Sequence, residues 1–554
     1  MRNRRLIILI LLFLAVNHVQ GQLAGSHGNL EIKLNQGETR VETTETGALM
    51  VQVSTKDLAR FKQRGYILYS DLGAKGDGKA DDIDAIAATH ALANQEGLTV
   101  KADPAFTYYI SGKARTAVIR TDTDFGSAKF ILDDTQVENR KMHVFLVASD
   151  LRPFVPEGLL SLQKNQKKID IPLPGPSLIT VTNSAVRRYI RFGPNQNQGH
   201  AQTDIFMVDQ NGHVDPNAPI IWDFDQITDV TAIPLDEAPL TIKGGTFTTI
   251  ANQEESKYNY YARGIGIRRS NVLLEGLEHR VTGEGDHGAP YGGFLNFSDC
   301  ANVTIRNTVL TGHKTYQTIG SAGVTVSMGT YDISINRAIN IRFEHCSQTN
   351  DINDPVYWGI MGSNFCKNLV LDHCSFSRFD AHMGVANATI RNSTLGHMGI
   401  NAIGTGTFLV ENSTINGRNL INLRSDYGST WQGEFIIRNC TFIPLGGRTA
   451  RPILIGASNA GQHDFGYTTY MPERIVIENL HIADSNHPVN YQGPVIFSNF
   501  NPRIKDDSYH EKYPYVRSKE VFLKNITTES GMELRVSDNP HLFKELKVVA
   551  LSDD

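Results

Sequence analysis

The chain has 554 residues, with 53 basic against 58 acidic side chains and a formal net charge of −5. This near balance excludes a globally basic surface of the kind that binds nucleic acid, so an anionic ligand would have to meet a local cluster of cations. No segment reaches about 18 consecutive apolar residues, which argues against a membrane-spanning helix.

The first 21 residues are predicted to be a secretory signal peptide. Three arginines precede an apolar run from Leu6 to Val16, and Val19-Gln20-Gly21 ends the segment with the small residues that a cleavage site needs. We therefore expect cleavage near Gly21 and a secreted or periplasmic protein without membrane insertion. We expect a monomer, and nucleic acid is not an expected partner.

Residues 22–65 are expected to form an irregular lead-in with a short helix near Thr55–Gln63. A glycine-rich turn follows within Tyr69-Ser-Asp-Leu-Gly-Ala-Lys-Gly-Asp-Gly-Lys-Ala-Asp-Asp-Ile. It leads into Asp81 and Asp82, which can cap a helix that begins near Ile83. Residues 66–134 are thus expected to hold an N-terminal cap and the first coils of a repeat.

This segment resembles the opening of the pectate-lyase-like β-helix family, in which a strand, an Asp-Phe-Gly-Ala-x-Gly-Asp-Gly turn and a capping helix close one end of a solenoid. Leu72 stands where that pattern has Phe, Ala80 stands where it usually has Thr, and residues 100–111 match its next part. The family includes pectate lyases, polygalacturonases, other polysaccharide lyases and hydrolases, phage tailspikes and epimerases. The resemblance therefore implies the fold and carbohydrate chemistry, and it carries no catalytic residue.

Residues 135–240 interrupt the repeat and are rich in proline, so we expect elaborated early coils or a small β subdomain packed on the side. Residues 241–554 then repeat a short phrase such as Val303-Thr-Ile-Arg-Asn307. The copies begin at residues 272, 303, 341, 369, 388, 408, 435, 475 and 521. Recurrence at this spacing, with insertions between copies, is typical of a solenoid.

Each phrase alternates apolar and polar residues, as a strand with one buried face does. Most copies end in Asn or His followed by a small residue, which suits a corner because Asn tolerates the left-handed backbone conformation. The pattern predicts an all-β fold, a right-handed parallel β-helix with an N-terminal capping helix and loop insertions. A leucine-rich repeat is the alternative, but its Leu-x-x-Leu-x-Leu frame is missing.

The chain has five cysteines, an odd number too small for a disulfide framework. Cys346, Cys374 and Cys440 occupy the small-residue position after the corner, so we expect buried apolar fillers. Metal binding or a disulfide is the alternative for these cysteines. No cofactor is expected, although Asp351 and Asp354 leave a calcium site open.

The loops after each corner should bring ionisable and aromatic side chains to one side of the helix, because equivalent positions of successive coils stack about 4.8 Å apart. The catalytic candidates are His313, Lys314, Asp380, His382, His397 and Arg424. The substrate-binding candidates are Arg280, Tyr316, Tyr357, Trp358, Arg378, Asn401, Arg418, Asp426, Tyr427 and Trp431. The short coils 369–407 should form the floor of a groove whose cations and aromatics suit an anionic polysaccharide.

Three functions compete. A lyase that cleaves a uronic-acid-containing polymer, such as a glycosaminoglycan or pectin, needs a base, a carboxylate clamp and an acid. We expect His382 or Lys314 as base, Arg424 as clamp and His397 as acid or orienting group, with Asp380 fixing a histidine.

A glycoside hydrolase needs two carboxylates about 5 to 9.5 Å apart, for which Asp380 could pair with Asp351 or Asp426. A non-catalytic carbohydrate-binding protein is the third possibility. If the predicted site fails, the loop that carries Glu284, Asp286 and His287 is the next candidate.

Overall fold

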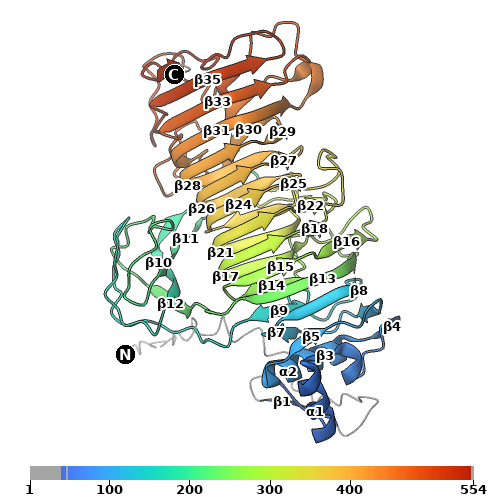
Figure 1. Ribbon diagram of the computed structural model, residues 1–554. Helices are drawn as coiled ribbons and strands as arrows, with labels where there is room; N and C mark the ends of the chain where they lie inside the picture. The colour runs from blue at the N-terminus through green and yellow to red at the C-terminus, as the bar shows by residue number, and fades with distance from the viewer. Residues whose placement is uncertain (1–38, 45–47, 551–554) are drawn as a thin grey trace, which may run out of the picture.

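The computed structural model describes residues 39–44 and 48–550. The predicted signal peptide lies outside these residues. Within the described ranges, no helix is long and apolar enough to cross a membrane. The chain forms a right-handed parallel β-helix, as the sequence predicted, with its N-terminal end at the bottom and its last coils at the top of Figure 1.

The parallel strands stack on three faces of the helix. The first face contains β7 (Ala117–Ile119), β9 (Phe145–Ala148), β14 (Ile265–Arg268), β17 (Gly292–Arg306), β21 (Tyr331–Glu344), β23 (Met361–Asn364), β26 (Phe379–Arg391), β28 (Ile400–Glu411), β30 (Asn419–Leu423), β32 (Ile453–Gly456) and β34 (Val495–Phe497). Long strands such as β17, β21, β26 and β28 bend and continue onto the second face.

The second face adds β3 (Tyr66–Leu68), β5 (Thr99–Lys101), β8 (Thr123–Asp133), β13 (Leu240–Ile250), β15 (Val272–Glu275), β24 (Lys367–Asp372), β31 (Trp431–Pro444), β33 (Arg474–Ile482), β35 (Glu520–Thr528) and β36 (Lys547–Ala550). The third face contains the C-terminal parts of long second-face strands such as β8, β13 and β31. It also contains the separate strands β4 (Asp77–Asp81), β6 (Thr107–Ile110), β16 (Glu278–Thr282), β18 (Val309–Leu310), β22 (Ser347–Gln348), β25 (Ser375–Phe376), β27 (Thr394–Leu395) and β29 (Thr414–Gly417).

The repeat phrase is the second-face strand, and its register confirms the alignment read from the sequence. Val272 pairs with Val303, Val303 with Ile341, and Ile341 with Leu369. The pairing continues through Ala388, Phe408, Phe435, Ile475 and Val521. Every predicted copy therefore occupies the same position on its rung.

The residue that ends each phrase forms the corner between the second and third faces. Asn307, His345, His373, Asn392, Asn412, Asn439, Asn479 and Asn525 all have positive φ. An amide ladder runs from Asn525 through Asn479, Asn439 and Asn412 to Asn392, with N···O distances of 2.7–3.3 Å. Below it, the rings of His345 and His373 stack 4.6 Å apart.

The N-terminal end is closed by helices. β1 (Arg40–Thr43) and β2 (Leu49–Gln52) form a hairpin, α1 (Thr55–Arg64) lies where a short helix was expected, and α2 (Ile83–Glu96) covers the first coil. Asp82 is the N-cap residue of α2, but its carboxylate accepts hydrogen bonds from the N–H groups of Lys75 and Gly76. It therefore fastens the glycine-rich turn rather than capping the helix, which corrects the expected role.

Residues 149–239 leave the helix between β9 and β13 and form a side insertion. Its antiparallel sheet has the order β11-β10-β12, with β10 (Ser177–Arg188), β11 (His200–Val208) and β12 (Asp229–Pro234). A buried ion pair of 2.8 Å between Lys367 Nζ and Asp204 Oδ1 fixes the insertion to β24. Figure 1 shows the insertion standing beside the middle coils.

Candidate active site

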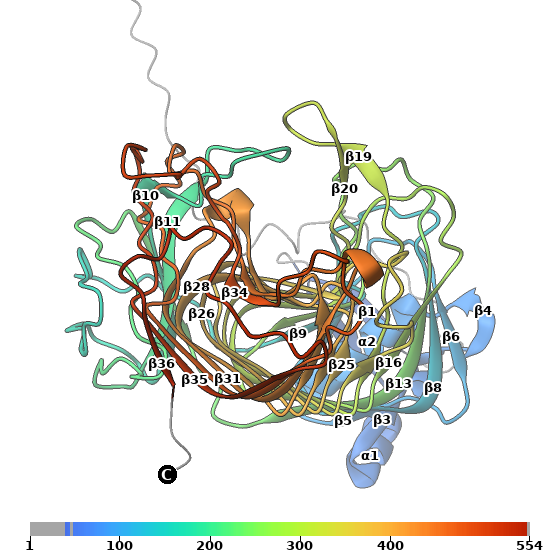
Figure 2. The same cartoon turned by 90° about the horizontal axis from the view of Figure 1, so that it is seen from above.

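Loops from two sides surround the first face. One side carries the insertion and the loop 424–430, and the other carries the long loops 311–330 and 349–360. The loop 190–199 of the insertion reaches the hairpin β19 (Gln317–Ile319) and β20 (Thr325–Ser327), where Ala322 N donates to Pro194 O and Ser321 Oγ to Gln196 O. Figure 2 shows this loop and the hairpin extending toward each other.

A cluster of three arginines and two aspartates, which we call the Arg–Asp cluster, lies on the first face. It consists of Arg191, Arg378, Asp380, Arg424 and Asp426. Asp426 Oδ2 lies 2.7 Å from Nη2 of both Arg191 and Arg424, and Asp380 Oδ2 lies 2.8 Å from Arg378 Nη2. Three guanidinium groups against two carboxylates leave the cluster with a net positive charge.

Burial differs within this cluster. Asp380 has no exposed surface and Arg378 is 4% exposed, whereas Arg424 and Arg191 keep 14% and 21% of their side-chain surface exposed. Burial raises the pKa of Asp380, against the effect of Arg378 and Arg424. Burial also favours a higher pKa for Asp426, but the opposite charges of Arg424 and Arg191 have the larger effect and lower the pKa of Asp426.

His382 lies beside this cluster, half-buried at the end of the first face. Burial lowers the pKa of His382 well below its ordinary value, and Arg424, Arg191 and Arg378 lower it further. Its Nδ1 lies 2.7 Å from Asn364 Oδ1, an acceptor, so Nδ1 carries the proton. Nε2 of a neutral His382 is then a lone-pair acceptor for which the described part of the chain offers no partner, and the imidazole can take up a proton there.

Several buried polar atoms of this site have no hydrogen-bond partner within residues 39–44 and 48–550. They are Nε and Nη1 of Arg378, Nε1 of Trp358 and both carboxylate oxygens of Asp380. The Arg378–Asp380 contact is short, but it lacks hydrogen-bond geometry, so it is an ion pair only. Buried polar atoms are nearly always paired, and a group of unpaired ones around one ion pair marks a place built for something other than stability.

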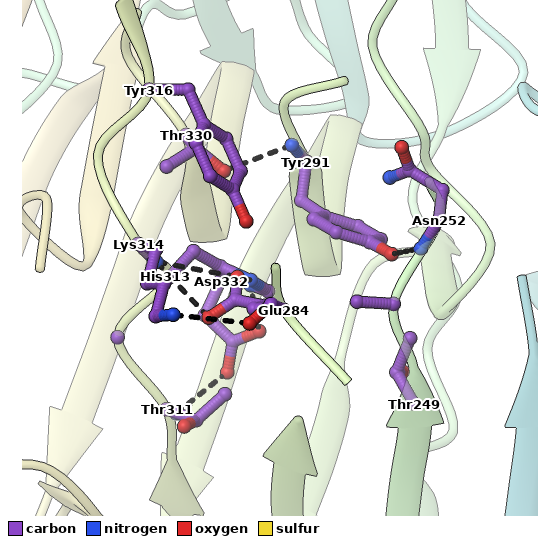
Figure 3. Close-up of polar contacts among 12 residues, drawn as sticks. Thr249, Asn252, Glu284, Tyr291, Thr311, His313, Lys314, Tyr316, Thr330 and Asp332 are labelled. Carbon is purple, nitrogen blue, oxygen red and sulfur yellow. Dashed lines mark hydrogen bonds and ion pairs between the residues drawn. The ribbon is translucent and has the colours of Figure 1, made fainter. Parts of the chain in front are cut away.

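A second cluster lies at the start of β21, and Figure 3 shows the part of it that contains Glu284, His313 and Asp332. Asp332 lies 2.8 Å from His279 Nδ1 and 3.2 Å from His313 Nε2, and Glu284 lies 3.2 Å from His313 Nδ1. We call these four residues the His–carboxylate cluster. Burial alone would lower the pKa of His313, but hydrogen bonds with Asp332 and Glu284 outweigh it and raise the pKa to about 9. His313 is therefore protonated at neutral pH and cannot act as a base there.

The structure separates the catalytic candidates into different places. Asp380, His382 and Arg424 come together, as do Arg378, Asp426 and Tyr427 from the substrate-binding set. Lys314 instead lies beside the His–carboxylate cluster, with Nζ donating to the carbonyls of Glu284 and Gly285. His397 Nδ1 contacts the Ile352 carbonyl, and so it lies with the loop 349–360.

The substrate-binding candidates are also divided. Trp358 lies near the Arg–Asp cluster, with the Arg378 guanidinium 5.6 Å from its ring centre. Asn401 pairs in register with Asp380 and accepts a hydrogen bond from Asn422. Tyr316 and Tyr357 belong to the loops around Lys314, where Tyr316 donates to the Gly285 carbonyl.

Three of these candidates lie away from any cluster. Trp431 has no exposed surface, because the chain has already returned to the second face there and its ring packs on Phe408 and Phe435. The expectation that Trp431 stacks on a sugar was wrong. Arg280, which pairs with Glu278, and Arg418 are exposed on the outside of the coils.

Sequence reasoning missed two residues of this site. Arg191 belongs to the insertion, outside the repeat, so no periodic signal places it beside Asp426. Asn364 precedes the phrase that starts at Leu369, and its bond to His382 joins two neighbouring rungs. Among the described residues no group of three or more His, Cys, Asp or Glu side chains could hold a metal ion, and Asp351 and Asp354 form no such group.

Solved structures that are similar to this chain include phage tailspike proteins. No family model and no curated protein matches the chain. The tailspike protein gp49 of Pseudomonas phage LKA1 is 13% identical over 86% of this chain and 83% of that chain, with a TM-score of 0.48. The tailspike gp61 of Pseudomonas phage phi297 is 13% identical over 83% and 80%, with a TM-score of 0.47.

A third structure is the Gp54 tailspike of Acinetobacter baumannii bacteriophage AP22, in complex with A. baumannii capsular saccharide. It is 9% identical over 90% of this chain and 80% of that chain, with a TM-score of 0.46. The chain itself folds as a right-handed parallel β-helix. It is the fold that the N-terminal resemblance implied.

Proposed function

We propose that the protein is an exported polysaccharide lyase that cleaves a uronic-acid-containing polymer by β-elimination. The proposal is carried by His382, whose pKa is lowered by burial and by three nearby guanidinium groups, and whose Nε2 has no partner among the described residues. A lyase needs this combination, because a cation must neutralise the uronate carboxylate before a base can remove the proton at C5.

Arg424 and Arg191 are the partly exposed cations of the cluster, and they would hold the carboxylate. His382 Nε2 would take the C5 proton, the electron pair would form the C4–C5 double bond, and the C4–O4 bond would break. The Tyr427 ring lies 5.4 Å from the His382 ring, and burial raises the pKa of Tyr427. Because Tyr427 is only 2% exposed, its hydroxyl is not available to O4, and O4 would take its proton from solvent.

The hydrolase alternative requires two carboxylates that reach the substrate. Asp380 has no exposed surface, and Asp426 is paired with two arginines. Neither carboxylate is available in the way that a glycosidase acid or nucleophile must be. These contacts favour the lyase.

The test is incubation with glycosaminoglycans, pectin and alginate while the ultraviolet absorbance of a 4,5-unsaturated uronate is followed. His382→Ala should lower turnover by at least about a hundredfold with little change in Tm, since general bases contribute about 10²–10⁴-fold. His397→Ala is the matched control and should keep near-normal turnover.

Other outcomes would identify the alternatives. Loss of turnover in Lys314→Ala together with normal turnover in His382→Ala would place the centre at the His–carboxylate cluster. Reducing ends without ultraviolet absorbance would identify a hydrolase. Binding without any product would identify a carbohydrate-binding protein.

A further inference from the structure

A cavity of about 290 Å³ lies between the side insertion and the helix, and it is lined by Arg188 at the end of β10 and by residues of β26 and β28. No residue of either cluster described above lines it. The link to the candidate site is Tyr189, which lines the cavity and packs against Tyr427, the neighbour of His382. The cavity is thus a separate compartment that lies close to the proposed catalytic centre.

Aromatic rings from both parts of the chain form one wall of this cavity. Trp222 of the insertion lies 6.3 Å from Tyr467 of the helix loops, and Tyr467 lies 5.0 Å from Tyr189. The Arg188 guanidinium lies 4.7 Å from the Trp222 ring centre. Partly exposed aromatic rings around a concave space are the surface on which pyranose rings stack.

The floor of the cavity contains glycines, and larger side chains would not fit there. A Cβ on Gly404 would lie 1.9 Å from the Val385 carbonyl oxygen, and a Cβ on Gly384, whose φ is +64°, would lie 2.9 Å from the Tyr189 hydroxyl. The volume is at the lower end of the range of about 300–1,000 Å³ for ligand sites, which suits one or two sugar rings.

The hydrogen-bond partners of the cavity's cations are neutral groups. Arg188 donates through Nε to Gln202 Oε1, and Lys164 Nζ contacts Gln432 Oε1 at 3.1 Å across from the insertion to the helix. Among the described contacts, neither cation forms an ion pair. With Asp223 as the acidic lining residue, two positive charges face one negative charge.

We propose that this cavity is a second carbohydrate-binding site, which holds one anionic pyranose unit outside the catalytic centre. The ring would stack on Trp222 and Tyr467, and its carboxylate or sulfate would meet Lys164 and Arg188. The ligand class is the one assumed for the lyase, but the site needs no catalysis, so the two proposals can fail separately.

The experiment uses ¹⁹F NMR of the full chain labelled with 5-fluorotryptophan. The chain has three tryptophans, and each one reports on a different place. Trp222 lines the cavity, Trp358 lies against Arg378 of the Arg–Asp cluster, and buried Trp431 reports on the integrity of the helix. Trp222→Phe and Trp358→Phe assign the signals, and the probes are D-glucuronate, D-galacturonate, glucose 6-sulfate and glucose.

Titration with an anionic sugar should shift the Trp222 signal with a Kd of order 1–10 mM, as expected for a single sugar unit. Lys164→Gln should weaken this binding by about tenfold, or 1.4 kcal/mol. Lys167→Gln, an exposed lysine of the insertion that does not line the cavity, is the matched control and should leave the binding unchanged. The Trp431 signal should stay constant throughout.

An unchanged Trp222 signal with all three anionic sugars would overturn the proposal, and an equal shift with glucose would overturn its anionic part. A shift of Trp358 alone would support the proposed lyase site and overturn the second site. A shift of Trp222 with no product from any polymer would support the second site and count against the lyase. Comparison of glucuronate with glucose 6-sulfate distinguishes a uronate from a sulfated sugar.

Discussion

Asn364→Asp should move the acid limb of the pH dependence of kcat/KM to higher pH. In the native site His382 Nδ1 lies 2.7 Å from a neutral amide oxygen, while burial and three arginines keep the His382 pKa well below its ordinary value. The base form therefore persists below pH 6.5. A carboxylate at the same position keeps the hydrogen bond and adds a negative charge, and an opposite charge in direct contact shifts a pKa by about 1–3 units toward the charged form.

The assay is the initial rate of unsaturated-uronate formation between about pH 4 and pH 8, which brackets the ordinary histidine pKa. The limb of Asn364→Asp should lie about 1–3 units above that of the native enzyme. Asn364→Ala is the control, because it removes the bond without adding charge. It should lower kcat, since the tautomer is no longer fixed, with a smaller shift of the limb. An unmoved limb in Asn364→Asp would refute His382 as the base.

Three further predictions concern stability. The pKa of His313 is raised to about 9, so the stability that it contributes is complete below about pH 6.5 and is lost as pH rises through 9. Tm should therefore fall between pH 7 and 10, and His313→Gln should make Tm less dependent on pH over this range. Lys367→Met should lower the free energy of unfolding by about 3–5 kcal/mol, because it leaves buried Asp204 without its partner, and Asp204→Asn in the same chain should restore most of the loss in urea titrations. Asn392→Leu should lower the free energy of unfolding by about 1–2 kcal/mol in the same titrations, because it breaks the amide ladder and places a branched residue at a φ of +52°. Asn392→Gly should lower it by less. Equal losses for the two variants would show that backbone strain is unimportant at this corner.

The β-helix was predictable because its repeat has a direct physical meaning. A phrase such as Val303 to Asn307 specifies one buried strand face and one left-handed corner, and identical rungs must stack in register. The positions of interior side chains were less predictable wherever an insertion interrupted the spacing of the repeat. Trp431 was assigned to a loop, although the chain had already rejoined the second face at that residue.

The candidate site was only partly predictable for a similar reason. Asp380, His382 and Arg424 lie in or next to short coils, so their offsets from the phrase place them on one face. His313, Lys314 and His397 follow the third face, where long loops determine the position of each side chain. Arg191 comes from an insertion that packs on the helix through long-range contacts, among them the Lys367–Asp204 ion pair and the apolar packing of Ile205 near Ile339. No local pattern in the sequence indicates these contacts.

The asparagine corner also determines where this architecture can change in length. From Asn307 to Asn439 a single small residue follows each corner residue. At Asn479 and Asn525 the strand runs through the corner with Leu480 and Ile526 next, so this corner carries no insertion from Asn307 to Asn525. The side insertion 149–239 and the loop 311–330 enter at the other two corners. The ladder thus acts as a spine that keeps the rungs in register, while the opposite side is free to gain, lose or exchange the loops that meet a ligand.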